Sequence, residues 1–185
     1  MRNALSYWLF LLWVLWVMQF PLRGARRRGE RRAKTAPAAL LGVIVQSAAY
    51  AIVLASSYFR MHTPEWWRAA LSLAFGTIAL LLLWSALPAL GKQWRVQAGV
   101  YEDHILVQTG AYRIVRHPIY ASMVALLLAT GFARASLTAC AVASAVMIIG
   151  TEIRVRAEER LLAGHFGRQF AEYQARVPAY LPYLR

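Results

Sequence analysis

Residues 69–90 read AALSLAFGTIALLLLWSALPAL, and this stretch carries no charged side chain. A helix of about 20 apolar residues crosses the hydrocarbon core of a bilayer, because each residue adds about 1.5 Å. Residues 36–59 are uncharged as well, and residues 5–20 contain only two polar side chains. Residues 119–151 contain a single charge, Arg134. Because soluble domains rarely repeat such blocks, the sequence predicts an all-α, polytopic membrane protein.

The overall composition agrees with a membrane protein and excludes other classes. Of the 185 residues, 59% are hydrophobic, and the net charge is +13. A strongly basic chain can indicate nucleic-acid binding. Here the basic residues flank apolar segments, which is where cytosolic Lys and Arg lie in membrane proteins, so we expect membrane lipid and no nucleic acid as a partner. The single cysteine, Cys140, excludes an intramolecular disulfide, and we expect it to be a small buried apolar group.

The apolar segments predict about five membrane helices. We place them at residues 4–21, 37–59, 66–90, 119–132 and 136–151. One helix over residues 119–151 would be roughly 50 Å long, which exceeds a bilayer, so a turn near residues 131–136 should make a hairpin. The first segment has its basic cluster after the apolar run, which favours a retained membrane helix over a cleaved signal peptide.

The distribution of basic residues predicts the orientation. With the N-terminus outside, the cytosolic segments are 21–35, 91–118 and 152–185, and together they contain 17 Lys and Arg residues against four outside. This asymmetry predicts a cytosolic C-terminus. The basic run between Arg23 and Lys34 is interpreted as an anchor for anionic lipid in preference to a specific binding site.

The order of the apolar and basic segments divides the chain into two parts. Residues 1–90 would form three membrane helices with a basic cytosolic loop at 21–35. Residues 91–185 would form a catalytic region made of a loop, the helical hairpin and a C-terminal cytosolic segment.

Polar groups suited to chemistry lie in two stretches, residues 97–120 and 154–184. Pro118 suits the first turn of a helix. Arg116 and His117 would then place positive groups at the positive end of that helix, which is explained either by cytosolic flanking charge or by a bound anion. Both explanations remain open on these residues alone.

Arg154 and Glu158 form the second candidate pair. They are four residues apart and would share a helical face just past the fifth membrane helix. They could form a surface ion pair worth about 0.3–0.5 kcal/mol, or a site that handles both a cation and an anion.

Other catalytic signatures are missing from the sequence. His104, His117 and His165 lack the spacing of a zinc site, and no cysteine joins them. No nucleotide-binding glycine motif or serine nucleophile motif is present. We therefore expect no metal.

A series of short motifs follows in order along the C-terminal half: residues 104–120 (HILVQTGAYRIVRHPIY), Glu158-Glu159, Phe166-Gly167, Tyr173, Arg176-Val177-Pro178 and Leu181-Pro182. This series resembles the isoprenylcysteine carboxyl methyltransferases, within a wider group that includes phospholipid N-methyltransferases. The resemblance covers residues 97–184, about half of the chain. The chain is shorter than the eukaryotic enzymes and resembles the compact prokaryotic members, which implies a prokaryotic inner membrane.

The resemblance implies a pocket for S-adenosyl-L-methionine on the cytosolic side, formed by the 91–120 loop and the C-terminal segment. It implies that Arg154 binds the carboxylate of a prenylcysteine-like group on a lipophilic or lipidated acceptor. The implied cofactor-binding residues are Gln97, His104, Ile105, Leu106, Val107, Tyr112, His117, Pro118, Ile119, Tyr120 and Glu158.

Three alternatives remain. A phospholipid or other amine N-methyltransferase would share the cofactor site without needing an arginine at the acceptor. A sterol-type membrane reductase has a similar Arg-His and acidic pattern but uses NADPH. A non-enzymatic membrane scaffold would explain the helices but not the ordered motifs.

Overall fold

The computed structural model describes residues 2–23, 34–35, 38–58, 65–91, 99–100 and 105–181. Most of these residues are helical. The elements are α1 (Arg2–Arg23), β1 (Lys34–Thr35), α2 (Ala38–Tyr58), α3 (Trp66–Leu90), β2 (Gly99–Val100), the 3₁₀ turn η2 (Gly110–Arg113), α4 (Pro118–Arg134), α5 (Leu137–Phe166) and α6 (Arg168–Arg176). The two short strands pair with each other in antiparallel register.

Helices α1, α2, α3 and α5 are each long and apolar enough to cross a bilayer. Helix α4 is also apolar but has only 17 residues, or about 25 Å. The chain is therefore an integral membrane protein of the all-α class, as the uncharged blocks predict.

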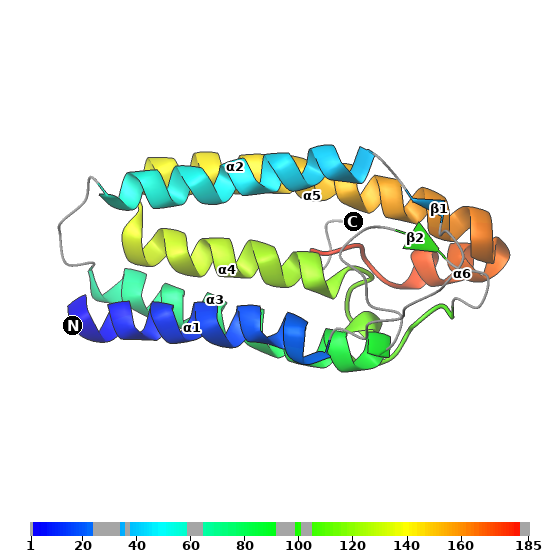
Figure 1. Cartoon of the computed structure of the whole chain (residues 1–185), viewed down its shortest axis with the longest axis horizontal. Coiled ribbons are helices and arrows are strands. Elements are labelled where there is room, and N and C mark those ends of the chain that lie inside the picture. Colours follow the sequence, from blue (N-terminus) through cyan, green and yellow to red (C-terminus); the bar gives the residue numbers. More distant parts are fainter. Residues whose placement is uncertain are drawn as a thin grey trace.

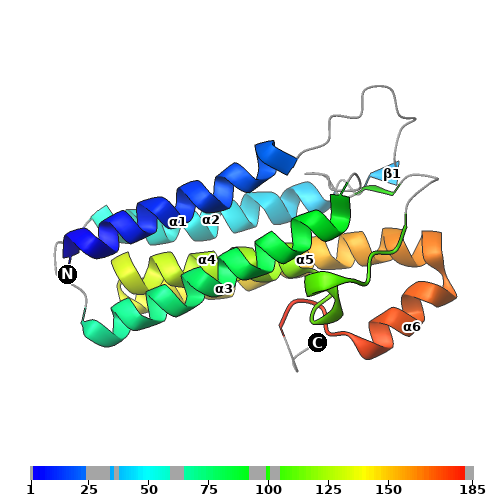
Figure 2. The same ribbon diagram turned by 90° about the horizontal axis from the view of Figure 1, so that it is seen from below.

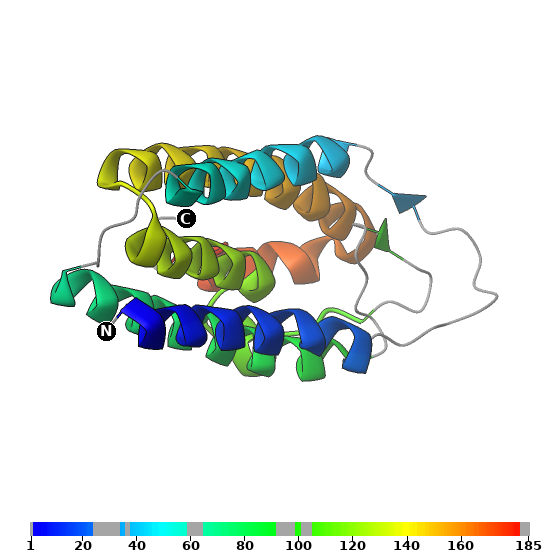
Figure 3. The ribbon, with the colours of Figure 1, turned by 60° about the vertical axis from the view of Figure 1, so that its left-hand side comes forward.

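Helix α4 lies at the centre of the bundle. In Figures 1 and 3, α2 and α5 run side by side along one edge, α1 and α3 along the other, and α4 lies between the two pairs. Two neighbouring leucines show the consequence: Leu126 packs in the cluster with α1 and α3, whereas Leu127 packs in the cluster with α2 and α5. A helix buried on both sides must be apolar around its circumference, as α4 is.

The predicted hairpin between α4 and α5 is confirmed. Ser136 caps α5, because its hydroxyl accepts a hydrogen bond from the backbone N–H of Ala139 at 3.1 Å. Arg68 of α3 is buried and donates to the carbonyls of Phe132, Gly131 and Ala135 at the end of α4. A positive side chain at a helix C-terminus satisfies free carbonyls and complements the helix dipole.

The predicted end of the fifth helix was wrong. Residue 151 ends the apolar run, but α5 continues to Phe166 and stops at Gly167, whose φ of 51° an L side chain rarely adopts. The charged residues after 151 are good helix formers, so the helix outlasts its apolar stretch. At 30 residues α5 is about 45 Å long. Arg154 and Glu158 therefore lie inside α5 and not beyond it.

The other predicted boundaries agree with the structure to within two residues, and Pro118 is the first residue of α4 as expected. Helix α6 was not predicted, because its nine residues contain no apolar block.

Helices α2 and α5 approach closely through glycine. A Cβ atom built on Gly150 would lie 2.9 Å from both the backbone nitrogen of Gln46 and the carbonyl oxygen of Gly42. A Cβ atom on Gly42 would in turn lie 2.7 Å from the carbonyl oxygen of Gly150. Small residues allow such backbone contact between membrane helices.

Replacing Gly150 by alanine is therefore expected to lower the free energy of unfolding by about 1–3 kcal/mol, because the added methyl group meets backbone atoms that cannot turn aside. The measurement is thermal unfolding in detergent. Gly164→Ala is the matched control, since nothing lies within 4 Å of a Cβ at that position of the same helix. It should be neutral or slightly stabilising, because alanine is favoured over glycine in helices by about 1 kcal/mol. Equal destabilisation by both changes would contradict the prediction.

Candidate active site

The candidate site lies at the end of the bundle where α5 extends beyond its neighbours. Figure 2 shows α6, η2 and the C-terminal segment gathered there, around the start of α4. Residues that are distant in the sequence meet at this end. The backbone N–H groups of Arg116 and His117 donate to the carbonyls of Pro178 and Ala179, at 2.8 and 2.7 Å. The hydroxyl of Tyr173 donates to the carbonyl of Tyr112 at 2.6 Å.

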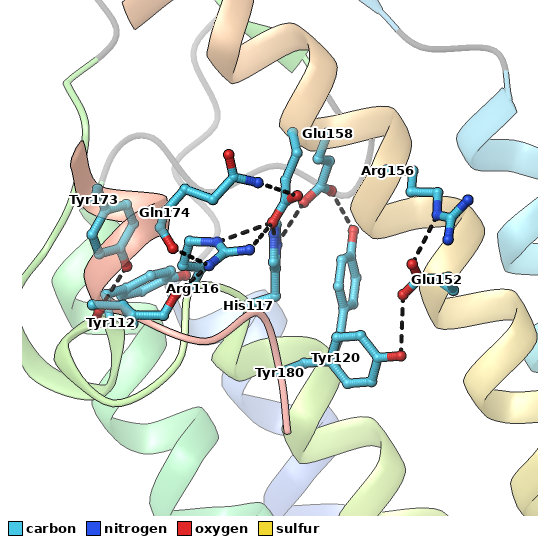
Figure 4. Close-up of polar contacts among 12 residues, drawn as sticks. Tyr112, Arg116, His117, Tyr120, Glu152, Arg156, Glu158, Tyr173, Gln174 and Tyr180 are labelled. Atoms are coloured by element: carbon cyan, nitrogen blue, oxygen red, sulfur yellow. Dashed lines mark hydrogen bonds and ion pairs between the residues drawn. The ribbon is translucent and has the colours of Figure 1, made fainter. Parts of the chain in front are cut away.

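The Arg116 side chain joins three segments of this end. Its guanidinium donates to the carboxylate of Glu159 on α5, with the shorter contact at 2.7 Å, and to the carbonyls of Gln174 and Val177. The Arg116 and Glu159 side chains are only 4% and 8% exposed. Gln174 donates to the other oxygen of Glu159 at 3.0 Å (Figure 4). A buried ion pair needs such additional hydrogen bonds to offset its desolvation.

His117 lies between two carboxylates. Its Nδ1 is 3.3 Å from Glu158 and its Nε2 is 3.3 Å from Glu159. Burial alone would lower the pKa of His117, but the hydrogen bonds and negative charges of the two glutamates outweigh burial and raise this pKa above its ordinary value. Two carboxylates of α5 therefore face the positive groups before α4, an arrangement that neither of the two explanations from the sequence had included.

The raised pKa of His117 predicts a pH dependence of stability. The folded protein holds this proton more tightly than the unfolded chain, whose ordinary pKa is 6.5. The stabilisation is therefore complete below about pH 6.5 and is lost as the pH rises through the higher pKa of the folded protein. We expect the thermal midpoint of the wild type to fall between pH 6 and pH 9, and to fall less in His117→Gln. Parallel pH profiles of the two proteins would contradict this assignment.

Tyr120 links the two candidate residues of α5. Its hydroxyl donates to Glu158, and its ring lies beneath the guanidinium of Arg154, with Cζ 4.5 Å from the ring centroid. The ring also stacks on His117 at 5.6 Å. Arg154 further donates from Nη1 to Oε1 of Gln46 on α2, at 3.0 Å. Both α5 side chains remain partly exposed. The site thus presents a guanidinium and a carboxylate on successive turns of one helix (Figure 4 shows the Glu158 side).

A family model for isoprenylcysteine carboxyl methyltransferases matches residues 70–164, just over half of the chain. The chain belongs to this family. The matched range includes α4, the Arg116–His117 pair and nearly all of α5.

Three relatives of this family member share 30–32% sequence identity with it. Protein-S-isoprenylcysteine O-methyltransferase B of Arabidopsis thaliana is 30% identical over 130 residues, which are 69% of this chain and 66% of that protein. The cobalt-zinc-cadmium resistance protein CzcN of Cupriavidus metallidurans is 32% identical over 123 residues, which are 64% of this chain and 52% of that protein. Protein-S-isoprenylcysteine O-methyltransferase of Schizosaccharomyces pombe is 30% identical over 83 residues, 45% of this chain and 35% of that protein. The matched part of the chain thus spans about a third to two thirds of these relatives.

The structure brings together most of the residues that the family resemblance implies. Val107, Tyr112 and Ile119 pack in one apolar cluster against Ala86 of α3. Burial, with a contribution from the charge of Glu158, raises the pKa of Tyr112 well above its ordinary value, so this phenol stays neutral. Three other residues are implied by the resemblance to bind the cofactor. Pro118 is buried, Leu106 is partly exposed and Ile105 is 67% exposed. Gln97 and His104 lie outside the described residues.

Two residues of the site were not assigned a role from the sequence. Gln46 is a single amide in an uncharged block, and it gives no motif that would mark it. Glu159 follows Glu158 directly and could not be assigned a separate partner without the fold. Among the described residues, no group of three or more His, Cys, Asp and Glu could hold a metal ion.

Proposed function

We propose that this protein is an S-adenosylmethionine-dependent methyltransferase that methylates the carboxylate of a lipophilic or lipidated acceptor, most specifically a prenylcysteine-like carboxylate. The observation that carries the proposal is the setting of Arg154. Its guanidinium is held by Gln46 and by the ring of Tyr120, in a partly exposed position where α2, α4 and α5 meet. Family membership supports the same reaction.

An arginine at this position suits a carboxylate acceptor. The guanidinium stays charged at any physiological pH, and its planar fork can donate to both oxygens of a carboxylate. A carboxylate is already ionised at neutral pH, so the chain needs no general base. Its contribution would be to hold one carboxylate oxygen toward the methyl group and to keep water away from it.

The residues around Glu158 are compatible with a cationic methyl donor. When bound, S-adenosylmethionine supplies a methyl group on a positively charged sulfur. Glu158 offers a carboxylate that is 24% exposed. Its charge acts on Tyr112, which packs in an apolar cluster with Val107 and Ile119. His117 fits less simply, because both of its ring nitrogens already face glutamates. Binding of a donor carboxylate by His117 would require a rearrangement there.

The charge distribution supports the proposed orientation, with the N-terminus outside and the site facing the cytosol. The sequence segments 21–35, 91–118 and 152–185, which include α6 and the residues just before α4, contain 17 of the 21 Lys and Arg residues. A water-soluble donor would then enter from the cytosol while an apolar acceptor stays in the membrane. We propose a prokaryotic inner membrane as the location.

The test is transfer of a labelled methyl group from S-adenosylmethionine by the purified full-length protein. The acceptors are N-acetyl-S-farnesylcysteine and, separately, phosphatidylethanolamine vesicles. Treating the product with base distinguishes them, because a methyl ester releases volatile methanol and a methylamine does not. We expect base-labile label on the farnesylcysteine.

Two results would overturn the proposal. Label that resists base and appears only on the phospholipid would indicate an amine methyltransferase. Calorimetric binding of NADPH without binding of S-adenosylmethionine would indicate a reductase.

A further inference from the structure

The close contact between α2 and α5 is built around Arg154. Gly42 and Gln46 lie one turn apart on α2 and face Gly150 and Arg154, one turn apart on α5. A Cβ atom on Gly42 would collide with Cγ of Arg154, so the aliphatic part of this arginine runs directly over the glycine. The Arg154 side chain therefore packs along α2 from its aliphatic part to its guanidinium.

The amide of Gln46 is fixed at both ends. Oε1 accepts from Nη1 of Arg154 at 3.0 Å, and Nε2 donates to Oγ1 of Thr151 at 2.9 Å. Arginine can only donate, so the amide oxygen must face Arg154 and the amide nitrogen must face Thr151. Gln46 and Thr151 are both fully buried, which leaves the amide one orientation.

The neutrality of Gln46 is chemically informative. The isosteric glutamate would also reach Nη1, but it would place an anion against the guanidinium. That anion would compete with an acceptor carboxylate for the same charge. A neutral amide holds the guanidinium in place without adding an anion that would neutralise its charge.

We propose that Gln46 is a positioning residue, which orients the Arg154 guanidinium for the acceptor carboxylate. This inference rests on the proposed function of Arg154. It assigns a role in the site to α2, which lies outside residues 70–164 matched by the family model.

The experiment compares Gln46→Leu and Gln46→Glu with Tyr50→Phe in the full-length protein. Tyr50 lies one turn further along α2, and its hydroxyl donates to the carbonyl of Met123 at 2.8 Å without contacting Arg154. Tyr50→Phe is therefore the matched control, because it also removes one side-chain hydrogen bond of α2. The probes are N-acetyl-S-farnesylcysteine as the acceptor and its carboxamide as a competitive ligand that lacks the carboxylate.

We expect Gln46→Leu to raise the KM for the farnesylcysteine about tenfold, the effect of one hydrogen bond to a charged group. Gln46→Glu should raise this KM at least as much, although it preserves the shape of the side chain. In both variants, the ratio of affinities for the acid and the carboxamide should be closer to one than it is in the wild type. The KM for S-adenosylmethionine should stay within about twofold in both variants, and Tyr50→Phe should change neither KM.

A structural role alone would reduce the amount of active protein and leave both KM values unchanged, and that result would overturn the inference. Should Gln46→Leu fail to fold, an unchanged acceptor KM in the isosteric Gln46→Glu would overturn it equally. The preference of the wild type for the acid over the carboxamide distinguishes failure of the inference from failure of the proposed function. A wild type that prefers the acid, with variants that keep this preference, overturns the inference alone. A wild type without that preference overturns the proposed function and the inference together.

Discussion

Replacing Arg154 by alanine is expected to reduce kcat/KM for carboxyl methylation about 100-fold or more. The loss would combine the charge proposed to bind the carboxylate with the alignment that this charge imposes, and misalignment of about 1 Å alone can have an effect of this size. Arg154→Lys should recover little, since an ammonium group lacks the planar fork and cannot lie over Tyr120 in the same way. The measurement is labelled methyl transfer to N-acetyl-S-farnesylcysteine, with thermal unfolding to confirm folding.

Arg156→Ala is the matched control. It removes the same charge two residues further along α5, where the side chain is 63% exposed and paired with Glu152 on the surface. We expect activity close to that of the wild type. Glu158→Ala should share the loss seen in Arg154→Ala, mainly through a higher KM for S-adenosylmethionine. Full activity in both the Arg154 and the Glu158 variants would refute these assignments.

Arg116→Ala is expected to cost about 3–5 kcal/mol in the free energy of unfolding. Removing Arg116 leaves the buried carboxylate of Glu159 without its arginine partner, so that only His117 and Gln174 remain to offset its desolvation. The same change releases the carbonyls of Gln174 and Val177, which tie the C-terminal segment to the start of α4. Chemical or thermal unfolding in detergent measures the effect.

The surface pair between Arg168 and Glu172 provides the comparison. It has the same residue types at helical spacing, but its side chains are 93% and 57% exposed. Arg168→Ala should cost no more than about 0.5 kcal/mol. Adding Glu159→Ala to Arg116→Ala should cost less than the sum of the two single changes, because the second change removes the buried carboxylate that has lost its arginine. Additive losses would show that the two residues do not act as a pair.

The membrane helices could be predicted because the length of an apolar run is a direct physical requirement of the bilayer. The same criterion failed for α5. It detects the part of a helix that contacts hydrocarbon, whereas charged residues such as Glu158 and Arg160 continue the helix through backbone hydrogen bonds that do not depend on hydropathy. Hydropathy also gave no sign of α6, whose buried side chains are limited to Phe170 and Tyr173.

The candidate site was predicted in part. Arg154, Glu158, His117 and Tyr120 were identified through ordered motifs, and the structure brings them into contact. Which groups pair could not be predicted, since Arg116 reaches Glu159 across 43 positions of the sequence. Gln46 is more remote still, at 108 positions from Arg154. Its importance depends on helix packing that no local pattern encodes.

The continuity of α5 has a mechanical consequence. Arg154 and Glu158 are separated by about one helical turn, roughly 5.4 Å, on a rod with no break between them. If α5 tilts or slides as the bilayer thickens or thins, the two side chains move as a unit. Their spacing is then set by the pitch of the helix and is independent of the lipid. A reaction between a lipid-soluble and a water-soluble partner would therefore keep the same distance between its two binding groups in bilayers of different thickness.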